Sequence, residues 1–425
     1  MLNRSIAPDF KEIKGINIIQ PEEIKFNNGL NAFIFKSSDL NLIKFEFVFN
    51  NVLKEEELSF INPILSSMLR EGTDTYSSKE IADTIDFYGA YLMPEYSFDH
   101  TSLTLYTLKK HVGKLLPVIL DILQNSTIPQ SELDTLIRNL KQSLKISLEK
   151  NEVIARRQFY SEVFSGTRYG VTPTAALYNS ILREDLKELY NNQITPSNCT
   201  LFISGKVDAE ILNLVTDLFG QQWVKTQEID THSNPIFNDY KKELIINEKT
   251  ESIQSAIRLG GLMVNRQHKD FPAIQFVNTL FGGFFGSRLM KNIREDKGFT
   301  YSIGSFVGNL KSTGFFTLAS EVGVEVTKQT IQEIQKEFEI LRQEKVSDTE
   351  LDLVRNYMQG QLLGSLESIF SHTDKFKTTY FSGLDTSYYE YYTEVIKNMD
   401  ASKVQDIAIQ YFDYDTLFKV VVGKF

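Results

Sequence analysis

Residues 132–149 read ELDTLIRNLKQSLKISLE, and residues 350–367 repeat the pattern as ELDLVRNYMQGQLLGSLE. Both stretches open with Glu-Leu-Asp and close with Ser-Leu-Glu, and Leu362 takes the place of Leu144. Apolar residues recur every three or four positions, which predicts a helix in each stretch. The displacement from residue 132 to residue 350 is 218, about half of the 425-residue chain. A repeat of this length indicates a duplicated domain, since a solenoid would repeat every ~20–50 residues.

The ends of the two halves repeat at the same displacement, with Ile-Ser-Gly-Lys at 203–206 and Val-Val-Gly-Lys at 421–424. Because a hydrophobic core stops growing at about 250–300 residues, a chain of 425 residues is expected to form at least two domains. Between the copies, residues 226–235 read TQEIDTHSNP and follow neither a helix nor a strand period. The sequence therefore predicts one domain at 1–225 and a second, homologous domain at 241–425.

Short-range signals predict strands and the starts of helices. An Asn-Gly turn divides the apolar stretch 24–35, which is typical of a β-hairpin. In KFEFVF at 44–49, phenylalanines alternate with Lys, Glu and Val, so one face of this strand should be buried while most of the other is solvated or at a sheet edge. Residues 253–259 also alternate like a strand. Two helix starts carry a capping box, Ser77-x-x-Glu80 and Ser347-x-x-Glu350.

Hairpins grouped with helices define the expected fold class. The sequence predicts an α+β protein of two tandem homologous domains, each an antiparallel sheet with helices packed on one face. The lone Cys199 cannot form an internal disulfide and is expected to be a buried structural thiol.

The charge balance narrows the choice of partners. Asp and Glu outnumber Lys and Arg by 55 to 45, and the net charge of -10 argues against nucleic-acid or anionic-membrane binding, which favours basic patches. The longest apolar runs fall far short of the ~18–20 residues of a membrane span. Residues 1–8 lack the apolar core of a secretory signal, which predicts a cytoplasmic protein, or a periplasmic one if a leader has been removed.

No self-contained active site can be found in the sequence. The five histidines are spaced too widely for a helix-borne metal motif: His100, His111, His232, His268 and His372. Neither a Gly-x-Ser-x-Gly elbow nor a phosphate-binding glycine motif occurs. We interpret Gly282-Gly283-x-x-Gly286 as a tight entry to a helix, with Ser287 near the N-cap.

Several motifs, taken in order, resemble one family. They are MLREGT at 68–73, SSKEIA at 77–82, Tyr-Gly-Ala at 88–90 and Gly-Gly-x-x-Gly-Ser-Arg-Leu at 282–289. Together with the two tandem halves and the early Asn-Gly hairpin, they resemble the pitrilysin or insulinase type of zinc peptidase. Within that family the nearest branch is that of the mitochondrial processing peptidase. The resemblance covers nearly the whole chain.

The resemblance also shows what this chain lacks. In the family, a His-x-x-Glu-His zinc motif stands directly before the Met-Leu-x-x-Gly-Thr stretch, and a Glu about 75 residues further on completes the ligand set. These positions fall here on Pro63, Ser66 and Ser67, and the distal position falls on Ser143. Serine hydroxyls are too weak as ligands to replace them, so no metal is expected in this chain. A nucleophilic Ser66 or Ser67 is not expected either, because no sequence neighbour supplies a base.

A second part of the family's site is present. Residues 287–302 are similar to the stretch in which the family carries an Arg, and a Tyr seven residues later, that reach into the catalytic cavity. The resemblance places them at Arg294 and Tyr301. A guanidinium and a phenol suit a substrate carbonyl and the oxyanion that develops on it. Alternatively, Arg294 pairs with Glu295 or Asp296 on a helix surface, and Tyr301 is a half-buried strand residue.

Three functions follow from these observations. The preferred one is a catalytically incomplete subunit of a heterodimeric zinc metallopeptidase, with the zinc in a homologous partner and a peptide substrate held by β-augmentation. The acidic balance would suit basic peptides. The second is a non-catalytic structural or peptide-binding homologue, like the core subunits of respiratory complexes that resemble this family, and the third is an enzyme with an unrecognised site. The tyrosines around Glu390 are interpreted as mixed core and surface aromatics and not as a peptide platform: Tyr388, Tyr389, Tyr391 and Tyr392.

Overall fold

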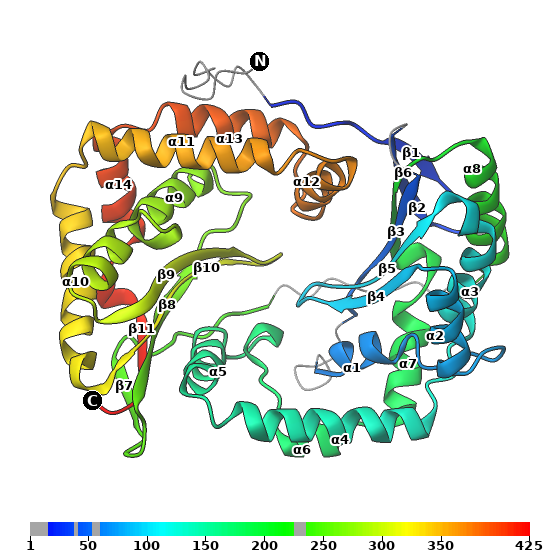
Figure 1. The fold of residues 1–425 in the computed structure, drawn as a ribbon, viewed down its shortest axis with the longest axis horizontal. Coiled ribbons are helices and arrows are strands. Elements are labelled where there is room, and N and C mark those ends of the chain that lie inside the picture. The colour runs from blue at the N-terminus through cyan, green and yellow to red at the C-terminus, as the bar shows by residue number, and fades with distance from the viewer. Residues whose placement is uncertain (1–15, 38–40, 53–59, 225–234) are drawn as a thin grey trace, which may run out of the picture.

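The computed structural model describes residues 16–37, 41–52, 60–224 and 235–425. Figure 1 shows two halves at opposite sides of the molecule, each with a sheet and its own helices. The predicted linker at 226–235 lies outside the described residues except for its last member, so the domain boundaries at 225 and 241 stay predictions.

The first half is built on a six-stranded sheet with the order β1-β2-β6-β3-β5-β4. Its helices enclose a large apolar core on one face of this sheet. The strands are β1 (Glu22–Lys25), β2 (Asn31–Lys36), β3 (Leu42–Asn50), β4 (Tyr91–Tyr96), β5 (His100–Leu108) and β6 (Cys199–Gly205). The α-helices are α1 (Ile61–Met68), α2 (Ser78–Phe87), α3 (Val112–Asn125), α4 (Gln130–Ser147), α5 (Asn151–Val163), α6 (Ala175–Asn179), α7 (Arg183–Gln193) and α8 (Ala209–Val215).

The second half is built on a five-stranded sheet with the order β7-β11-β8-β10-β9. The strands are β7 (Leu244–Glu248), β8 (Gln254–Met263), β9 (Thr300–Asn309), β10 (Gly314–Gly323) and β11 (Phe418–Gly423). The α-helices are α9 (Phe271–Asn278), α10 (Thr327–Gln343), α11 (Asp348–Gly364), α12 (Ile369–Phe381), α13 (Ser387–Lys397) and α14 (Ala401–Tyr411). Two π-helical segments, η6 (Thr279–Gly283) and η7 (Met290–Asp296), precede β9.

The predicted α+β architecture of two tandem domains is confirmed. Helices α4 and α11 occupy the duplicated stretches, and β1 and β2 form the predicted hairpin. Gly29 in its turn has a φ of 88°, which only glycine adopts readily. Each sheet also contains one parallel pair, β2 with β6 and β7 with β11, whereas the other neighbours are antiparallel. Both sheets are therefore mixed, and the prediction of purely antiparallel sheets is wrong at these two pairs, which join strands far apart in the chain.

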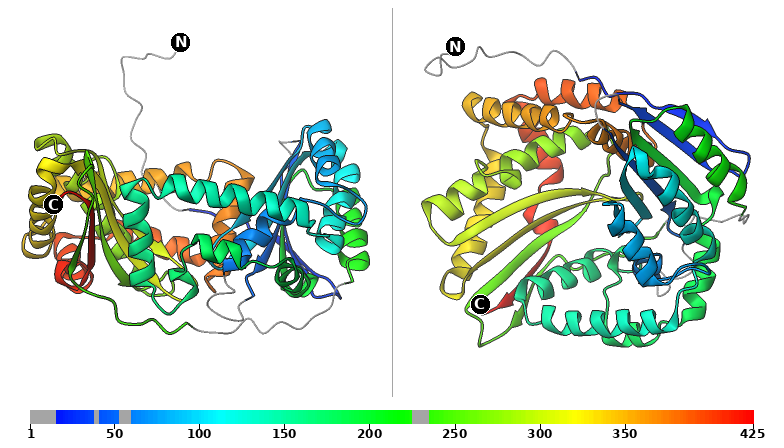
Figure 2. Two further views of the ribbon diagram at one scale, coloured as in Figure 1. Left: turned by 90° about the horizontal axis from the view of Figure 1, so that it is seen from below. Right: turned by 45° about the vertical axis from the view of Figure 1, so that its right-hand side comes forward.

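Each half lends one helix to the sheet of the other half. Helix α5 of the first half packs against β8 and β11, and α12 of the second half packs against β2 and β6. The two helices begin at residues 151 and 369, the same displacement of 218 that the sequence repeat shows. The left view of Figure 2 shows the two sheets at opposite ends of the molecule, joined by helices. The duplicated halves are thus interlocked and do not merely lie side by side.

The tips of two hairpins form a second contact between the halves. Asp99 lies in the turn between β4 and β5, and its carboxylate accepts a hydrogen bond of 2.9 Å from the backbone N–H of Lys311 in the turn between β9 and β10. The same carboxylate pairs with Arg168 and accepts from the hydroxyl of Tyr169 at 2.9 Å. The largely buried pair of Arg168 with Asp99 lies within the first half and fixes this carboxylate, which then joins the two tips through its hydrogen bond from Lys311.

The exchanged helix α12 overturns one expectation about β3. We expected most of the face of β3 that carries Lys44 and Glu46 to be solvated or at an edge, but both residues are buried. The Lys44 Nζ atom lies 2.8 Å from Glu46 Oε2 and 3.1 Å from Asp374 Oδ1 on α12. Burial alone would lower the pKa of Lys44, but the carboxylates of Glu46 and Asp374 outweigh burial and raise the pKa. The alternation of polar and apolar residues in β3 suggested a solvated face, but a helix from the other half of the chain covers that face.

The two predicted capping boxes differ in the structure. At α2, Ser77 accepts from the backbone N–H of Glu80 while the Glu80 carboxylate accepts from that of Ser77, so the box is complete. At α11, the Ser347 side chain caps the backbone N–H of Glu350, but the Glu350 carboxylate is held elsewhere. It accepts two hydrogen bonds from the guanidinium of Arg288, at 2.6 and 2.8 Å. The second box is therefore only half formed, because Arg288 competes for the carboxylate.

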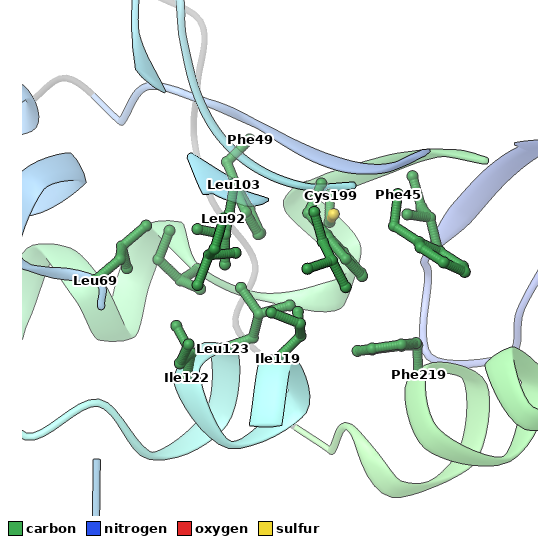
Figure 3. Packing of buried hydrophobic residues seen from close by; sticks show 14 of the residues in the cluster. Phe45, Phe49, Leu69, Leu92, Leu103, Ile119, Ile122, Leu123, Cys199 and Phe219 are labelled. Atoms are coloured by element: carbon green, nitrogen blue, oxygen red, sulfur yellow. The ribbon is translucent and has the colours of Figure 1, made fainter. Parts of the chain in front are cut away.

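Cys199 lies in the core of the first half, as predicted. Figure 3 shows its sulfur among apolar side chains that include Phe45, Leu103 and Ile119. Burial raises the pKa of the Cys199 thiol well above its usual value, so it stays protonated and unreactive. In the second half, the strand predicted at 253–259 is confirmed from Gln254 onward as part of β8.

Within the ranges that the structure describes, no helix combines the length and the apolar character needed to cross a lipid bilayer.

We expect Phe376→Ala to destabilise the first half of the chain, although Phe376 belongs to the second half. Its ring lies 4.9 Å from that of Phe33 and 5.5 Å from that of Phe35, so truncation leaves a cavity on the first sheet. The free energy of unfolding should fall by about 3 kcal/mol. The fluorescence of Trp223, the only tryptophan, reports on the first half because its indole is buried in that core.

Urea unfolding followed at Trp223 measures this effect. Phe87→Ala is the matched control, because Phe87 is 81% exposed and its loss should change the free energy of unfolding by at most about 0.5 kcal/mol. An equal response of the two variants would show that α12 does not stabilise the first sheet.

Candidate functional site

The positions that correspond to the family's zinc motif lie on α1. Ser66 is buried, and the Ser67 hydroxyl donates to the backbone oxygen of Pro63 at 3.1 Å. The Pro63 side chain has no donor atom for a metal. Ser67 also lines a groove of about 520 Å³ together with Asn139 on α4. Ser143 lies one turn beyond Asn139 on the same helix and is exposed.

These residues do not fit a zinc ion. Two serines and a proline provide none of the imidazole or carboxylate donors that zinc takes in peptidases. Among the described residues, no group of three His, Cys, Asp or Glu side chains is arranged to hold a metal. His232 lies outside these residues. Of the other histidines, His100 contacts Phe381 in a tilted arrangement with ring centroids 4.2 Å apart, and burial lowers the pKa of His100 to about 4. We therefore derive no catalytic step through a metal in this chain.

Arg294 and Tyr301 are brought together by the structure. The Arg294 guanidinium carbon lies 5.3 Å from the centroid of the Tyr301 ring and 4.6 Å from that of the Phe285 ring. Both aromatic rings are exposed, Phe285 by 62% and Tyr301 by 87%. We call Phe285, Arg294 and Tyr301 the Arg294 cluster. A guanidinium held between two rings keeps its N–H edges available to other groups.

The sequence also allowed a purely structural interpretation, in which Arg294 forms an ion pair with its helix neighbours and Tyr301 is half-buried. The structure of the described residues shows neither feature. Among the described residues, no ion pair joins Arg294 to Glu295, to Asp296 or to another carboxylate. Tyr301 is nearly fully exposed and not half-buried. Their catalytic role stays a prediction, but the geometry leaves both polar groups free to meet a ligand.

The local fold explains why the two side chains meet. Ser287 stands directly before the helical stretch that continues into η7, as expected from the glycine-rich entry, and Ile293 anchors η7 in the core. Gly298 then takes a φ of 65°, which reverses the chain between η7 and β9. This reversal places Tyr301, at the start of β9, beside Arg294 of η7.

Two residues that support the cluster were missed by sequence reasoning. Phe285 was not predicted to take part in the site. The signal that could have identified it is its position as an aromatic residue inside a glycine-rich turn. The role of Arg288 was also missed. Its bidentate pair with Glu350 ties the start of the η7 stretch to α11.

Comparison with known families identifies the family to which this chain belongs. The family described as Insulinase (Peptidase family M16) matches residues 61–173, and the family described as Peptidase M16 inactive domain matches residues 180–358. The chain belongs to the peptidase M16 family. The predicted resemblance to insulinase-type peptidases is confirmed at the level of the family, and the first match begins at α1, the helix on which the sequence analysis places the zinc-motif positions.

Three curated relatives illustrate the range of this family. The uncharacterized zinc protease YmxG of Bacillus subtilis is 24% identical over 73% of this chain and 76% of its own length. The probable inactive metalloprotease YmfF of the same organism is 22% identical over 55% of this chain and 54% of its own length. Subunit 1 of the mitochondrial cytochrome b-c1 complex of Caenorhabditis elegans is 23% identical over 74% of this chain and 69% of its own length.

A solved structure confirms the fold. The peptidase M16 inactive domain from Pseudomonas fluorescens superposes with a TM-score of 0.85 and covers 96% of this chain and 99% of its own. The sequence identity is 18%, so this likeness concerns the fold alone.

We expect the pair between Arg288 and Glu350 to stabilise the second half. Replacing Arg288 by Met leaves the Glu350 carboxylate without its partner in a largely buried position, which should lower the free energy of unfolding by about 2–3 kcal/mol. The double variant with Glu350→Met should recover part of this loss, because it removes both charges. Urea titrations of the wild type, the single variants and the double variant give the coupling energy.

Lys79→Met provides the control for this cycle, because Lys79 pairs with Asp83 on an exposed surface. Its unfolding midpoint should match that of the wild type. Independent, additive effects of Arg288→Met and Glu350→Met would contradict the assigned pair.

Proposed function

We propose that this chain is the zinc-free subunit of a two-chain peptidase, and that Arg294 and Tyr301 act in an active site completed by a homologous zinc-bearing partner. The observation that carries the proposal is the Arg294 cluster. A guanidinium without a carboxylate partner among the described residues, set between two exposed rings, is suited to bind a ligand from outside the chain.

The proposed chemistry is peptide hydrolysis, in which water adds across an amide. The hydroxyl joins the carbonyl carbon, negative charge develops on the carbonyl oxygen, and a proton reaches the leaving nitrogen. The metal of the partner would supply the activated water. Arg294 and the Tyr301 hydroxyl would donate hydrogen bonds to the carbonyl oxygen, and such donors stabilise the transition state more than the substrate because the charge on this oxygen grows.

A substrate peptide can approach this site along a sheet edge. Strand β9 is an edge strand and begins beside the Arg294 cluster. It contains no proline, so its backbone groups can pair with an added strand. One of the two edge strands of the first sheet, β4, is interrupted by Pro94, which cannot donate a backbone hydrogen bond. We therefore favour β9 as the edge that receives the peptide.

Relatives of two kinds support the proposal. YmxG is named a zinc protease, while YmfF is named a probable inactive metalloprotease, so the family contains chains with and without the complete site. The similarity to subunit 1 of a cytochrome b-c1 complex favours a second candidate, a non-catalytic structural subunit. The two candidates differ in whether the Arg294 cluster affects turnover.

The decisive experiment is reconstitution with a homologue that carries His-x-x-Glu-His and is encoded by a neighbouring gene. Peptide cleavage should be low for either chain alone and should rise in the mixture. Arg294→Ala in this chain should lower kcat of the mixture about 100-fold, because an oxyanion donor is lost. Tyr301→Phe should lower kcat by about tenfold, because only one neutral donor is lost.

Two controls separate this effect from a loss of folding or assembly. Arg138→Ala, on the exposed surface of α4, and Tyr391→Phe, on α13, should leave kcat unchanged. Gel filtration shows whether each variant still assembles with the partner. If the mixture is no more active than the partner alone, or if both cluster variants are silent, the split-site proposal is wrong and the structural candidate remains.

We also expect the purified chain to hold no stoichiometric zinc. Elemental analysis after dialysis against zinc-containing buffer should find far less than one ion per chain, because Pro63, Ser66 and Ser67 provide no adequate ligands. The partner, treated in the same way, serves as the positive control. One tightly retained zinc ion per chain would overturn this expectation.

A further inference from the structure

A cavity in the second half gathers positive charge without a counter-charge. It lies between α9, α11, α12 and α13 and has a volume of about 440 Å³. Arg266, in the loop before α9, and Lys375, on α12, both line it. Among the described residues that line this cavity, none carries a carboxylate. We call it the cationic cavity.

Carboxylates compensate these two cations only in part, through Asp374, which lies too far from Lys375 for an ion pair. In the described part of the chain, Arg266 and Lys375 take part in no ion pair. Arg266 donates to the Ser382 hydroxyl at 3.2 Å, to the backbone oxygen of Thr378 at 3.5 Å and to the Tyr388 hydroxyl, which leaves part of its N–H groups available. Burial, and after it the positive charge of Arg266, lower the pKa of Lys375. Two like charges that share a half-buried cavity repel each other, and an anion between them would relieve this repulsion.

The other face of α12 provides an internal comparison. Lys377, two residues after Lys375, pairs with Glu46 of β3 and with Asp374. The same helix therefore carries one lysine that is neutralised by carboxylates and one that is not. A solvated surface lysine needs no such partner, but Lys375 is half-buried.

Tyrosines of α13 complete the lining of the cavity. Tyr388, Tyr389 and Tyr392 face the cavity, and Tyr389 donates its hydroxyl proton to the backbone oxygen of Lys375 at 3.0 Å. Burial raises the pKa of Tyr388 to about 12, so its hydroxyl stays a neutral donor. Ile16 and Ile18 pack in one apolar cluster with these tyrosines. The prediction of mixed core and surface aromatics holds, since Tyr389 is buried while Tyr391 is 42% exposed.

The geometry points to an oxyanion-binding site, in which Arg266 and Lys375 hold a carboxylate or phosphate group and the tyrosines contact the body of the ligand. The guanidinium suits the planar or tetrahedral arrangement of these oxygens, and the ammonium adds a point charge. The ligand is a small anionic molecule or the carboxyl end of a peptide. This inference does not rest on the split-site proposal, because the cavity and the Arg294 cluster share no residue.

Binding to the full chain can be measured by isothermal titration calorimetry at low ionic strength. Four probes distinguish the sources of the oxyanion: inorganic phosphate, citrate, a tripeptide with a free C-terminus and the same tripeptide with an amidated C-terminus. At least one anion should bind, and preference for the free over the amidated peptide would identify a peptide carboxylate as the ligand. Preference for phosphate or citrate would identify a small anionic molecule.

Variants then locate the binding. Lys375→Gln and Arg266→Gln should each weaken binding about tenfold or more, because each removes a charge-assisted interaction. Lys375→Arg keeps the charge and should retain most of the affinity. Arg138→Gln and Lys336→Gln remove one exposed charge each and should bind as the wild type does.

Circular dichroism shows whether each variant is folded before its affinity is compared. If Arg266→Gln fails to fold, the comparison of Lys375→Gln with Lys375→Arg still tests the site. The inference is overturned if none of the four probes binds. It is also overturned if Lys375→Gln binds as tightly as the wild type, because the anion would then be bound elsewhere.

Discussion

Each sheet of this protein has a second face that its own half leaves uncovered. On the first sheet, this face carries Phe33, Phe35 and Phe202, which would form a contiguous apolar patch if the first half stood alone. Helix α12 covers this patch, and α5 covers the corresponding face of the second sheet. The exchange fixes the two halves relative to each other (Figure 1), and it therefore also fixes α1 relative to the Arg294 cluster.

The exchange also explains which features could be predicted from the sequence. The repeated helices, the Asn-Gly hairpin and the complete cap at Ser77 depend on residues close together in the chain, and these predictions hold. The outer face of β3 could not be predicted, because its cover lies 330 residues further along, at Asp374. The parallel pairing of β2 with β6 also joins residues far apart in the chain, as in the pairing of Asn31 with Thr200. In the candidate site, the resemblance to a family located Arg294 and Tyr301, but Phe285 belongs to no motif and became visible only through its ring contact.

The positions on α1 that we align with the family's zinc motif show how a helix without metal ligands keeps its place in this fold. Two histidines and a glutamate without zinc would leave polar groups unpaired against a hydrophobic core. Here Pro63 stands in the first turn of α1, where proline is tolerated, and it provides the backbone oxygen to which Ser67 donates. Ile64, Leu65 and Met68 stay buried in the core. The helix thus keeps its packing role, while small side chains replace the ligands.

Helix α12 shows that a net charge of -10 says little about local charge. Toward the first sheet, Lys377 and Asp374 meet Lys44 and Glu46, so two cations face two carboxylates. Toward the cationic cavity, the half-buried Lys375 forms no ion pair among the described residues, and a partly desolvated charge without such a pair costs free energy. The aromatic contacts of α12 with the first sheet must outweigh this cost for the helix to stay in place. The cationic cavity and the interlocking of the two halves therefore depend on the same helix, and a change that loosens its apolar face will also displace Lys375.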